Sequence, residues 1–137
     1  MKEGWCNDRY FVLFDEPEWT ETTRGYFAGG GIPGHTVIGL LSWDDLIVCD
    51  EFGRTFSLPA VPMEPHYRSE LHLPDLSDLA PESRFTGKIK WYVKPIVFGG
   101  DPNEGPNVIW VSHQQHRELV AWWNAKYREV KANGAAA

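Results

Sequence analysis

Apolar positions in the first half of the chain fall into short runs that charged and turn-forming residues separate. The runs are rich in aromatic and β-branched residues and cover 10–14, 35–41, 46–49 and 54–58. Runs of this length and composition are typical of β-strands. The last three are joined by the short turns 42–45 and 50–53, and strands joined by short turns are antiparallel neighbours. The pattern therefore predicts an antiparallel meander over 35–58.

Three further regions show strand patterns. Residues 24–27, Arg-Gly-Tyr-Phe, are partly aromatic and precede a glycine-rich loop at 29–34. In 88–98, apolar residues alternate with lysines, so that one face of the strand is apolar and the other cationic. Residues 107–111 form a last short apolar run. Together with the meander, these regions predict about five or six strands.

The periodicity changes to that of an amphipathic helix after Ser112. Ser112 and Gln115 fit a capping box, in which each side chain accepts a hydrogen bond from the backbone of the other residue. Beyond them, apolar side chains recur on one arc at about 100° per residue: Leu119, Val120, Trp123, Tyr127 and Val130. We expect the helix to pack on the sheet through Leu119, Trp123 and Tyr127 and to end at Asn133-Gly134.

Residues 59–87 show neither the alternation of a strand nor the periodicity of an amphipathic helix. Pro59, Pro62 and Pro65 recur every three residues, which is the repeat of a polyproline II segment. A stretch of this length without a clear strand or helix pattern is uncommon inside a compact domain and is often functional. It is either an extended binding segment or a cover over a sheet edge.

The composition fits one ordinary globular domain. The chain has 137 residues, of which 42% are hydrophobic and 23% are charged, and both values are close to the average. Strands followed by one long helix predict an α+β fold, with an antiparallel sheet of about five or six strands packed against a long C-terminal amphipathic helix. We expect a single domain over 1–134 and a frayed tail at 135–137.

Charge is distributed unevenly along the chain. The net charge is -6, with -9 in residues 1–84 and +3 in residues 85–137. An acidic body repels phosphate backbones, so we expect no nucleic-acid partner, and it attracts basic proteins. No apolar run approaches the roughly 20 residues that span a bilayer, and the opening residues are unlike a signal peptide. With only two cysteines, the chain is expected to be cytoplasmic, without a membrane partner or disulfide.

Acidic residues concentrate at the two predicted turns, 42–45 and 50–53. Loops on a rigid sheet commonly present binding residues. The adjoining proline-rich segment 59–70 is already extended, and it contains residue types that are enriched at interaction hot spots. We predict a partner-binding surface at Trp43, Asp44, Asp45, Asp50, Glu51, Tyr67 and Arg68.

Motifs for catalysis are weak. Neither a nucleophile elbow nor a phosphate-binding loop is present, so we expect a non-catalytic protein without a cofactor. His113 and His116 lie three residues apart at the start of the predicted helix, a spacing that puts both imidazoles on one side, where they could hold zinc. A small metal-dependent hydrolase is therefore a second hypothesis, with a third ligand drawn from His66, Glu70 and His72.

A third hypothesis is a carbohydrate-binding module. The chain contains seven tryptophans, and indole rings bury large apolar area while keeping one polar N–H group. Those beside acidic or amide residues could stack on sugar rings, and the candidates are Trp5, Trp19 and Trp43.

The region 95–128 resembles a known family. It contains Phe-Gly-Gly-Asp-Pro, then Asn-Val-Ile-Trp at 107–110, then His116 and the run Leu-Val-Ala-Trp-Trp-Asn at 119–124. This pattern is similar to the C-terminal regions of small bacterial proteins encoded beside secreted toxins, including immunity proteins of the SUKH superfamily. The resemblance implies a small, acidic, cytoplasmic, non-catalytic binder that covers the active site of a toxin. A basic toxin domain would suit the acidic surface, because complementary charge accelerates association.

Overall fold

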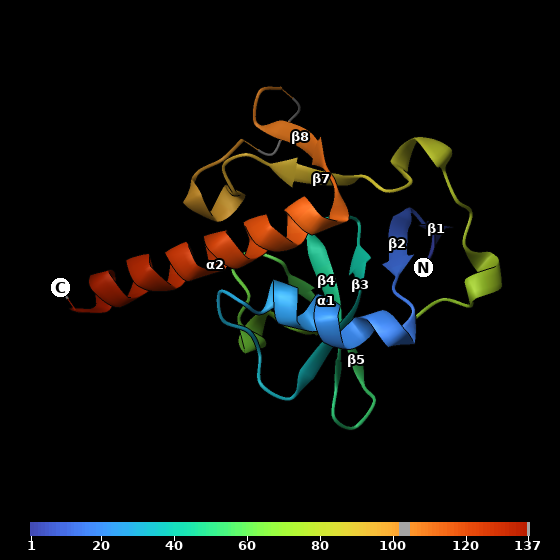
Figure 1. The fold of residues 1–137 in the computed structure, drawn as a ribbon, viewed down its shortest axis with the longest axis horizontal. Helices are drawn as coiled ribbons and strands as arrows, with labels where there is room; N and C mark the ends of the chain where they lie inside the picture. The colour runs from blue at the N-terminus through green and yellow to red at the C-terminus, as the bar shows by residue number, and fades with distance from the viewer. Residues whose placement is uncertain (102–104, 137) are drawn as a thin grey trace.

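A computed structural model describes residues 1–101 and 105–136. Within these residues the fold is α+β, as predicted, with a six-stranded antiparallel sheet and a two-stranded second sheet (Figure 1). The six strands pair in chain order: β1 (Lys2–Cys6), β2 (Arg9–Leu13), β3 (His35–Leu41), β4 (Asp45–Asp50), β5 (Thr55–Pro59) and β6 (Ser69–Glu70). The second sheet contains β7 (Ile89–Tyr92) and β8 (Val108–Val111), and the helices are α1 (Trp19–Tyr26) and α2 (His113–Ala136).

The predicted meander is confirmed by the pairing of β3, β4 and β5. Strand β4 lies inside the sheet, where Leu46, Ile47 and Val48 are each fully buried. A strand that is covered on both faces reads as a continuous apolar run rather than an alternation. The sequence pattern did not indicate β1, which is joined to β2 by a two-residue turn at Asn7 and Asp8, with φ of 50° and 68°. Asn and Asp tolerate this left-handed conformation better than most residues.

The prediction of a strand at 24–27 is wrong, because its first three residues form the last turn of α1. A capping box between Asp15 and Glu18 precedes this helix. Thr22 and Tyr26 are its buried residues, and their spacing of four places both on one helix face. The short window 24–27 contains too little of this period to distinguish a helix from a strand.

Helix α2 begins where the sequence predicts. Gln115 N–H donates to Ser112 Oγ over 3.1 Å, and Ser112 N–H donates to Gln115 Oε1 over 2.9 Å. The helix continues to Ala136, so the prediction that it ends at Asn133-Gly134 is wrong. A glycine costs about 1 kcal/mol in a helix relative to alanine, and the alanines beside it favour the helix. Of the predicted tail, residue 137 lies outside the described residues.

The buried face of α2 is centred on different residues from those expected. His116, Val120 and Asn124, spaced four apart, are 0%, 0% and 1% exposed. Leu119 and Trp123 pack half-buried against the same core. Two of the three central positions are therefore polar, and a search for apolar periodicity does not register them.

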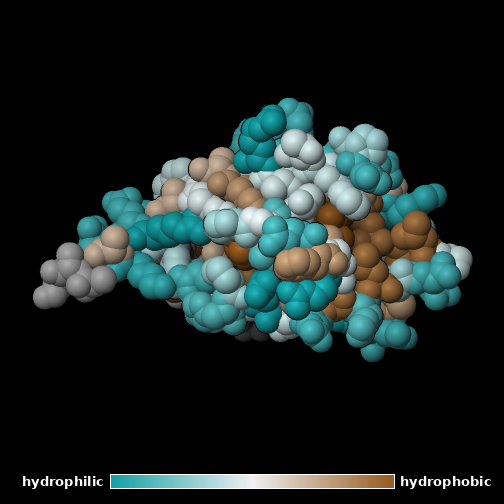
Figure 2. All heavy atoms as spheres, turned by 90° about the horizontal axis from the view of Figure 1, so that it is seen from below, coloured by the Kyte–Doolittle hydropathy of each residue, from teal (hydrophilic) through white to brown (hydrophobic). Residues whose placement is uncertain are grey.

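Both faces of the six-stranded sheet are covered. Helices α1 and α2 and the second sheet cover one face, as Figure 1 shows. Residues 59–87 cross from this face to the other and back, because Ala60, Met63 and Phe85 pack in the core on the α2 side, whereas Leu71 and Leu79 pack on the opposite face. This segment is tied to both sheet edges, because Leu71 N–H donates to Thr55 O at one edge and Ala80 pairs with Trp5 at the other. Seen from below in Figure 2, apolar residues gather at the end of the molecule away from the C-terminal end of α2.

The amide of Asn124 connects α2 to the start of the crossing segment. It accepts a hydrogen bond from Met63 N–H over 2.8 Å, and it donates to Ala60 O and Val120 O over 2.7 and 2.9 Å. Both amide hydrogens and the amide oxygen are thus used inside the core. Such a satisfied buried group is costly to remove, because its partners stay behind without hydrogen bonds.

Replacing Asn124 with alanine should therefore lower the free energy of unfolding by about 2–4 kcal/mol, since Met63 N–H and Ala60 C=O lose their only polar partner on α2. Asn133→Ala is the control, because Asn133 lies exposed on the same helix and should change stability by less than about 0.5 kcal/mol. Urea unfolding measures both. Equal stabilities of the two variants would contradict this role of Asn124.

Candidate functional site

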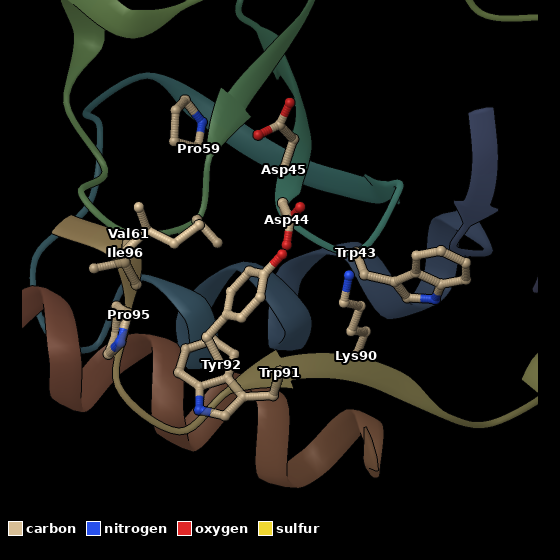
Figure 3. A pocket seen from close by; sticks show the side chains of 11 residues that line it. Trp43, Asp44, Asp45, Pro59, Val61, Lys90, Trp91, Tyr92, Pro95 and Ile96 are labelled. Carbon is tan, nitrogen blue, oxygen red and sulfur yellow. The ribbon is translucent and has the colours of Figure 1, made fainter. Parts of the chain in front are cut away.

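A cleft of about 150 Å³ lies between the β3–β4 turn and the start of the second sheet (Figure 3). One wall comes from the turn and from the chain after β5, and the other from β7 and the residues that follow it. The lining residues are Trp43, Asp44, Asp45, Pro59, Ala60, Val61, Lys90, Trp91, Tyr92, Pro95 and Ile96. They include three members of the predicted binding surface: Trp43, Asp44 and Asp45.

The turn that carries the acidic wall is held firmly. Ser42 and Trp43 both adopt left-handed conformations, with φ of 49° and 64°, which is uncommon for residues other than glycine. Ser42 N–H donates to Tyr10 O over 2.7 Å, and Ala60 N–H donates to Asp44 O over 3.0 Å. Backbone bonds on both sides thus fix the direction in which Asp44 leaves the sheet.

Trp43 is a half-buried wall of the cleft. Its ring stacks on Tyr10 at 5.2 Å and meets Phe85 and Trp110 edge-on at 5.0 and 5.5 Å. Such aromatic pairs add about 0.5–1.5 kcal/mol each beyond the area that they bury. The indole N–H of Trp43 is buried and has no acceptor in the described part of the chain. Trp43 therefore both packs in the core and borders the candidate site.

Asp44 and Asp45 are carboxylates without a hydrogen-bond or ion-pair partner among the described residues. Burial raises the pKa of Asp44, although the charge of Lys90 lowers it in part. Burial also raises the pKa of Asp45, and the negative charge of Asp44 raises it further. Asp45 is half-buried and Asp44 is exposed, and the surrounding protein atoms crowd both carboxylates without supplying a partner.

The opposite wall comes from β7 and the short helix η5 (Ile96–Phe98). Trp91 is 7% exposed, and its indole N–H is buried with no acceptor in residues 1–101 or 105–136. Lys90 Nζ lies 5.3 Å from the ring centre of Tyr92. Ile96 is half exposed at the mouth of the cleft, and exposed Val93 and Val97 flank it in sequence.

The other predicted binding residues lie away from this cleft. Asp50 and Glu51 are at the opposite end of β4 from Asp45. The Asp50 carboxylate accepts hydrogen bonds from Phe52 N–H, Arg54 N–H and Arg54 Nε. Burial by itself raises the pKa of Asp50, but these bonds outweigh it and leave the pKa below the ordinary value. Asp50 thus organises its turn, whereas Glu51 is exposed.

Tyr67 and Arg68 belong to the same end as Asp50. Arg68 Nη1 lies 2.8 Å from His35 Nε2, and its guanidinium sits 4.5 Å above the ring of Phe56. His35 is the β3 residue that faces Asp50 across the sheet. Tyr67 is 44% exposed. The structure therefore divides the seven predicted residues between the two ends of β4.

Sequence reasoning missed Lys90, Tyr92 and Ile96 as cleft residues. They lie about 50 residues from the acidic turn in the chain, and periodicity reports only on near neighbours in sequence. One signal was available, because the alternation in β7 indicated a cationic face. Nothing local indicated that this face would meet the acidic turn.

The histidine pair is not joined by a third candidate ligand in the part of the chain that the structure describes. No group of three or more His, Cys, Asp or Glu side chains that could hold a metal is found in the described residues. His116 Nδ1 lies 2.6 Å from the hydroxyl of Tyr26, and both side chains are fully buried. Of the third ligands considered, His66 contacts Glu64 instead, with Nε2 and Oε2 3.3 Å apart. His116 is thus a core residue, whereas His113 is half-buried.

The three tryptophans considered for sugar binding are half-buried. Trp5 Nε1 donates to Glu82 Oε2 and Trp19 Nε1 donates to Phe14 O, each over 3.0 Å. These contacts hold the indoles against the fold rather than presenting their faces to solvent. The more exposed indoles are Trp110 and Trp122, at 44% and 58%.

The cleft contains acidic groups, whose charge attracts cations. The polar groups of its lining residues are two carboxylates, one amine, one phenol and two indoles. Within the described residues, no helix combines the length and the apolar character that crossing a membrane requires.

The stability of the protein should depend on His116 below neutral pH. Burial, together with the charges of nearby His113 and Arg117, lowers the pKa of His116 to about 3. Between pH 6.5 and 3 the unfolded chain binds a proton that the folded chain does not. The free energy of unfolding should therefore fall as the pH falls, by up to about 1.4 kcal/mol per pH unit from this residue.

Urea unfolding at several pH values from 7 to 4 measures this slope. His116→Gln should remove this share of the pH dependence, whereas His72→Gln, at an exposed position, should leave it intact. Parallel slopes for wild type and His116→Gln would show that His116 is protonated in the folded protein as readily as in the unfolded chain.

Comparison with protein-family models, with curated proteins and with solved structures finds no match for this chain. The assignment of function therefore depends on the geometry of the cleft.

Proposed function

We propose that this chain is a non-catalytic binding module of the immunity type, which neutralises a basic toxin domain by docking on it through the Asp44–Asp45 cleft. The observation that carries the proposal is the pair of adjacent carboxylates, exposed Asp44 and half-buried Asp45, which line the cleft and which no described residue pairs with. A charge that has lost water without gaining a partner costs stability. A basic group from another molecule would offset this cost.

The size of the cleft favours a protein partner over a small substrate. Pockets for drug-sized ligands typically measure about 300–1,000 Å³, whereas this cleft measures about 150 Å³. That volume suits one side chain. Ile96 of its lining is exposed, as are its neighbours in sequence Val93 and Val97, and a group of exposed apolar residues is typical of a protein interaction surface.

The overall charge supports a basic partner. The chain has a net charge of -6, and complementary charge on two proteins accelerates their encounter and discriminates against acidic competitors. The segment 95–128, which resembles immunity proteins of the SUKH superfamily, contributes Pro95 and Ile96 to the cleft. The resemblance and the cleft thus involve the same part of the chain.

The double variant Asp44→Asn, Asp45→Asn tests the proposal. Its affinity for a catalytically inactivated basic toxin domain should fall by about tenfold or more, because truncating a buried charge contact typically costs 2–5 kcal/mol. Isothermal titration calorimetry at physiological salt measures the affinity, and protection of cells from the active toxin should weaken in parallel.

The matched control is Glu16→Gln, Glu51→Gln, which removes the same net charge at exposed positions outside the cleft. Its affinity should stay within about twofold of wild type, since screened surface charges contribute little. Equal losses of affinity in the two double variants would mean that binding depends on the overall charge of the chain and not on the cleft. Undiminished binding by Asp44→Asn, Asp45→Asn would refute the proposed site.

A further inference from the structure

We propose that the occupant of the cleft is the guanidinium group of an arginine side chain on the partner protein, with Asp44 as its direct acceptor. This inference rests on the proposed function and names the chemistry of the contact. It follows from three features that meet in the cleft: unpaired acidic acceptors, an aromatic wall and a volume that suits one side chain.

The acceptors come from the acidic turn. In Figure 3 the Asp44 carboxylate lies toward Tyr92 and Lys90, whereas Asp45 lies toward Pro59. Asp44 is therefore the carboxylate that faces the β7 wall, and Asp45 adds a second negative charge on the same turn. A guanidinium presents donors in a planar fork that matches a carboxylate, which an ammonium does not.

The opposite wall supplies a surface for a flat cation. Tyr92 supplies the aromatic ring that extends toward Asp44, whereas the Trp91 indole packs edge-on against His116 of α2 behind it. Guanidinium groups stack on aromatic faces and are more weakly hydrated than ammonium groups, so they lose less on entering a partly dry site. The carbon stem of an arginine can pack on the apolar parts of Val61 and Ile96.

The chain's own cation does not fill this role. Lys90 lowers the pKa of Asp44 through its charge, but no ion pair within 4 Å joins the two in the described structure. The N–H group of Trp91 is a second unsatisfied polar group in the wall. It is a buried donor without an acceptor on the described chain.

A capped tripeptide, acetyl-Gly-Arg-Gly-amide, provides the test, with its lysine and citrulline counterparts as comparisons. Binding is followed by NMR at the indole N–H resonances of Trp43 and Trp91, which Trp→Phe variants assign. The arginine peptide should shift both resonances saturably, with a dissociation constant of about millimolar size for so small a ligand. The lysine peptide should bind at least about threefold more weakly, and the uncharged citrulline peptide should leave both resonances unchanged.

Two variants sharpen the test. Asp44→Asn, Asp45→Asn should abolish the shifts, while Glu16→Gln, Glu51→Gln should retain them. Tyr92→Leu keeps both carboxylates but removes one aromatic ring, so it should reduce the preference for arginine over lysine. Equal binding of the arginine and lysine peptides to the wild-type chain would overturn the assignment to guanidinium. Displacement of the arginine peptide by an equal concentration of Mg²⁺ would overturn it in favour of a metal cation.

The outcomes separate this inference from the proposed function. If the toxin domain binds with the predicted dependence on Asp44 and Asp45 but the arginine peptide shifts neither indole, the guanidinium assignment fails and the binding function stands. If the peptide binds as expected but the toxin domain does not, the cleft is a guanidinium site and the immunity function fails.

Discussion

The buried amide of Asn124 is the interaction that connects the core to the candidate site. Asn124 donates to Ala60 O, and Ala60 N–H donates to Asp44 O. The backbone C=O and N–H groups of the single residue Ala60 thus link Asn124, at the centre of α2, to the turn that carries Asp44. Because a buried amide has strict directional requirements, the position of Asp44 relative to β7 is set by hydrogen bonds as well as by apolar contacts.

Local patterns predicted those parts of the fold that local forces decide. The apolar run of β4 and the capping box of Ser112 and Gln115 each depend on residues close in sequence, and both were predicted correctly. Helix α1 was missed because its buried residues, Thr22 and Tyr26, leave only a sparse apolar stripe. The buried face of α2 was predicted off-centre because His116 and Asn124 are polar. Their burial becomes favourable only through Tyr26 and Ala60, which are distant in sequence.

The sequence predicted one wall of the candidate site, the acidic turn, but not the opposite wall. Turn chemistry and charge indicated Asp44 and Asp45, but the same reasoning grouped them with Asp50, whose carboxylate is fully used in shaping its own turn. Sequence alone does not distinguish an aspartate that completes a turn from one that lacks a partner. Lys90 and Tyr92 reach the cleft only because β7 returns beside the β3–β4 turn, and this arrangement depends on the packing of the second sheet against α2.

The crossing segment 59–87 has a consequence for how this molecule can associate. It places β6 on β5 and Ala80 on Trp5 of β1, so one continuous piece of chain occupies both borders of the six-stranded sheet. Unpaired borders invite other chains to add strands, which leads to domain swapping and to fibrillar aggregates. Because β6 is only two residues long and β1 is bridged at its Trp5, the borders of the main sheet offer only short stretches of backbone to an added strand, which directs recognition of another protein to side chains.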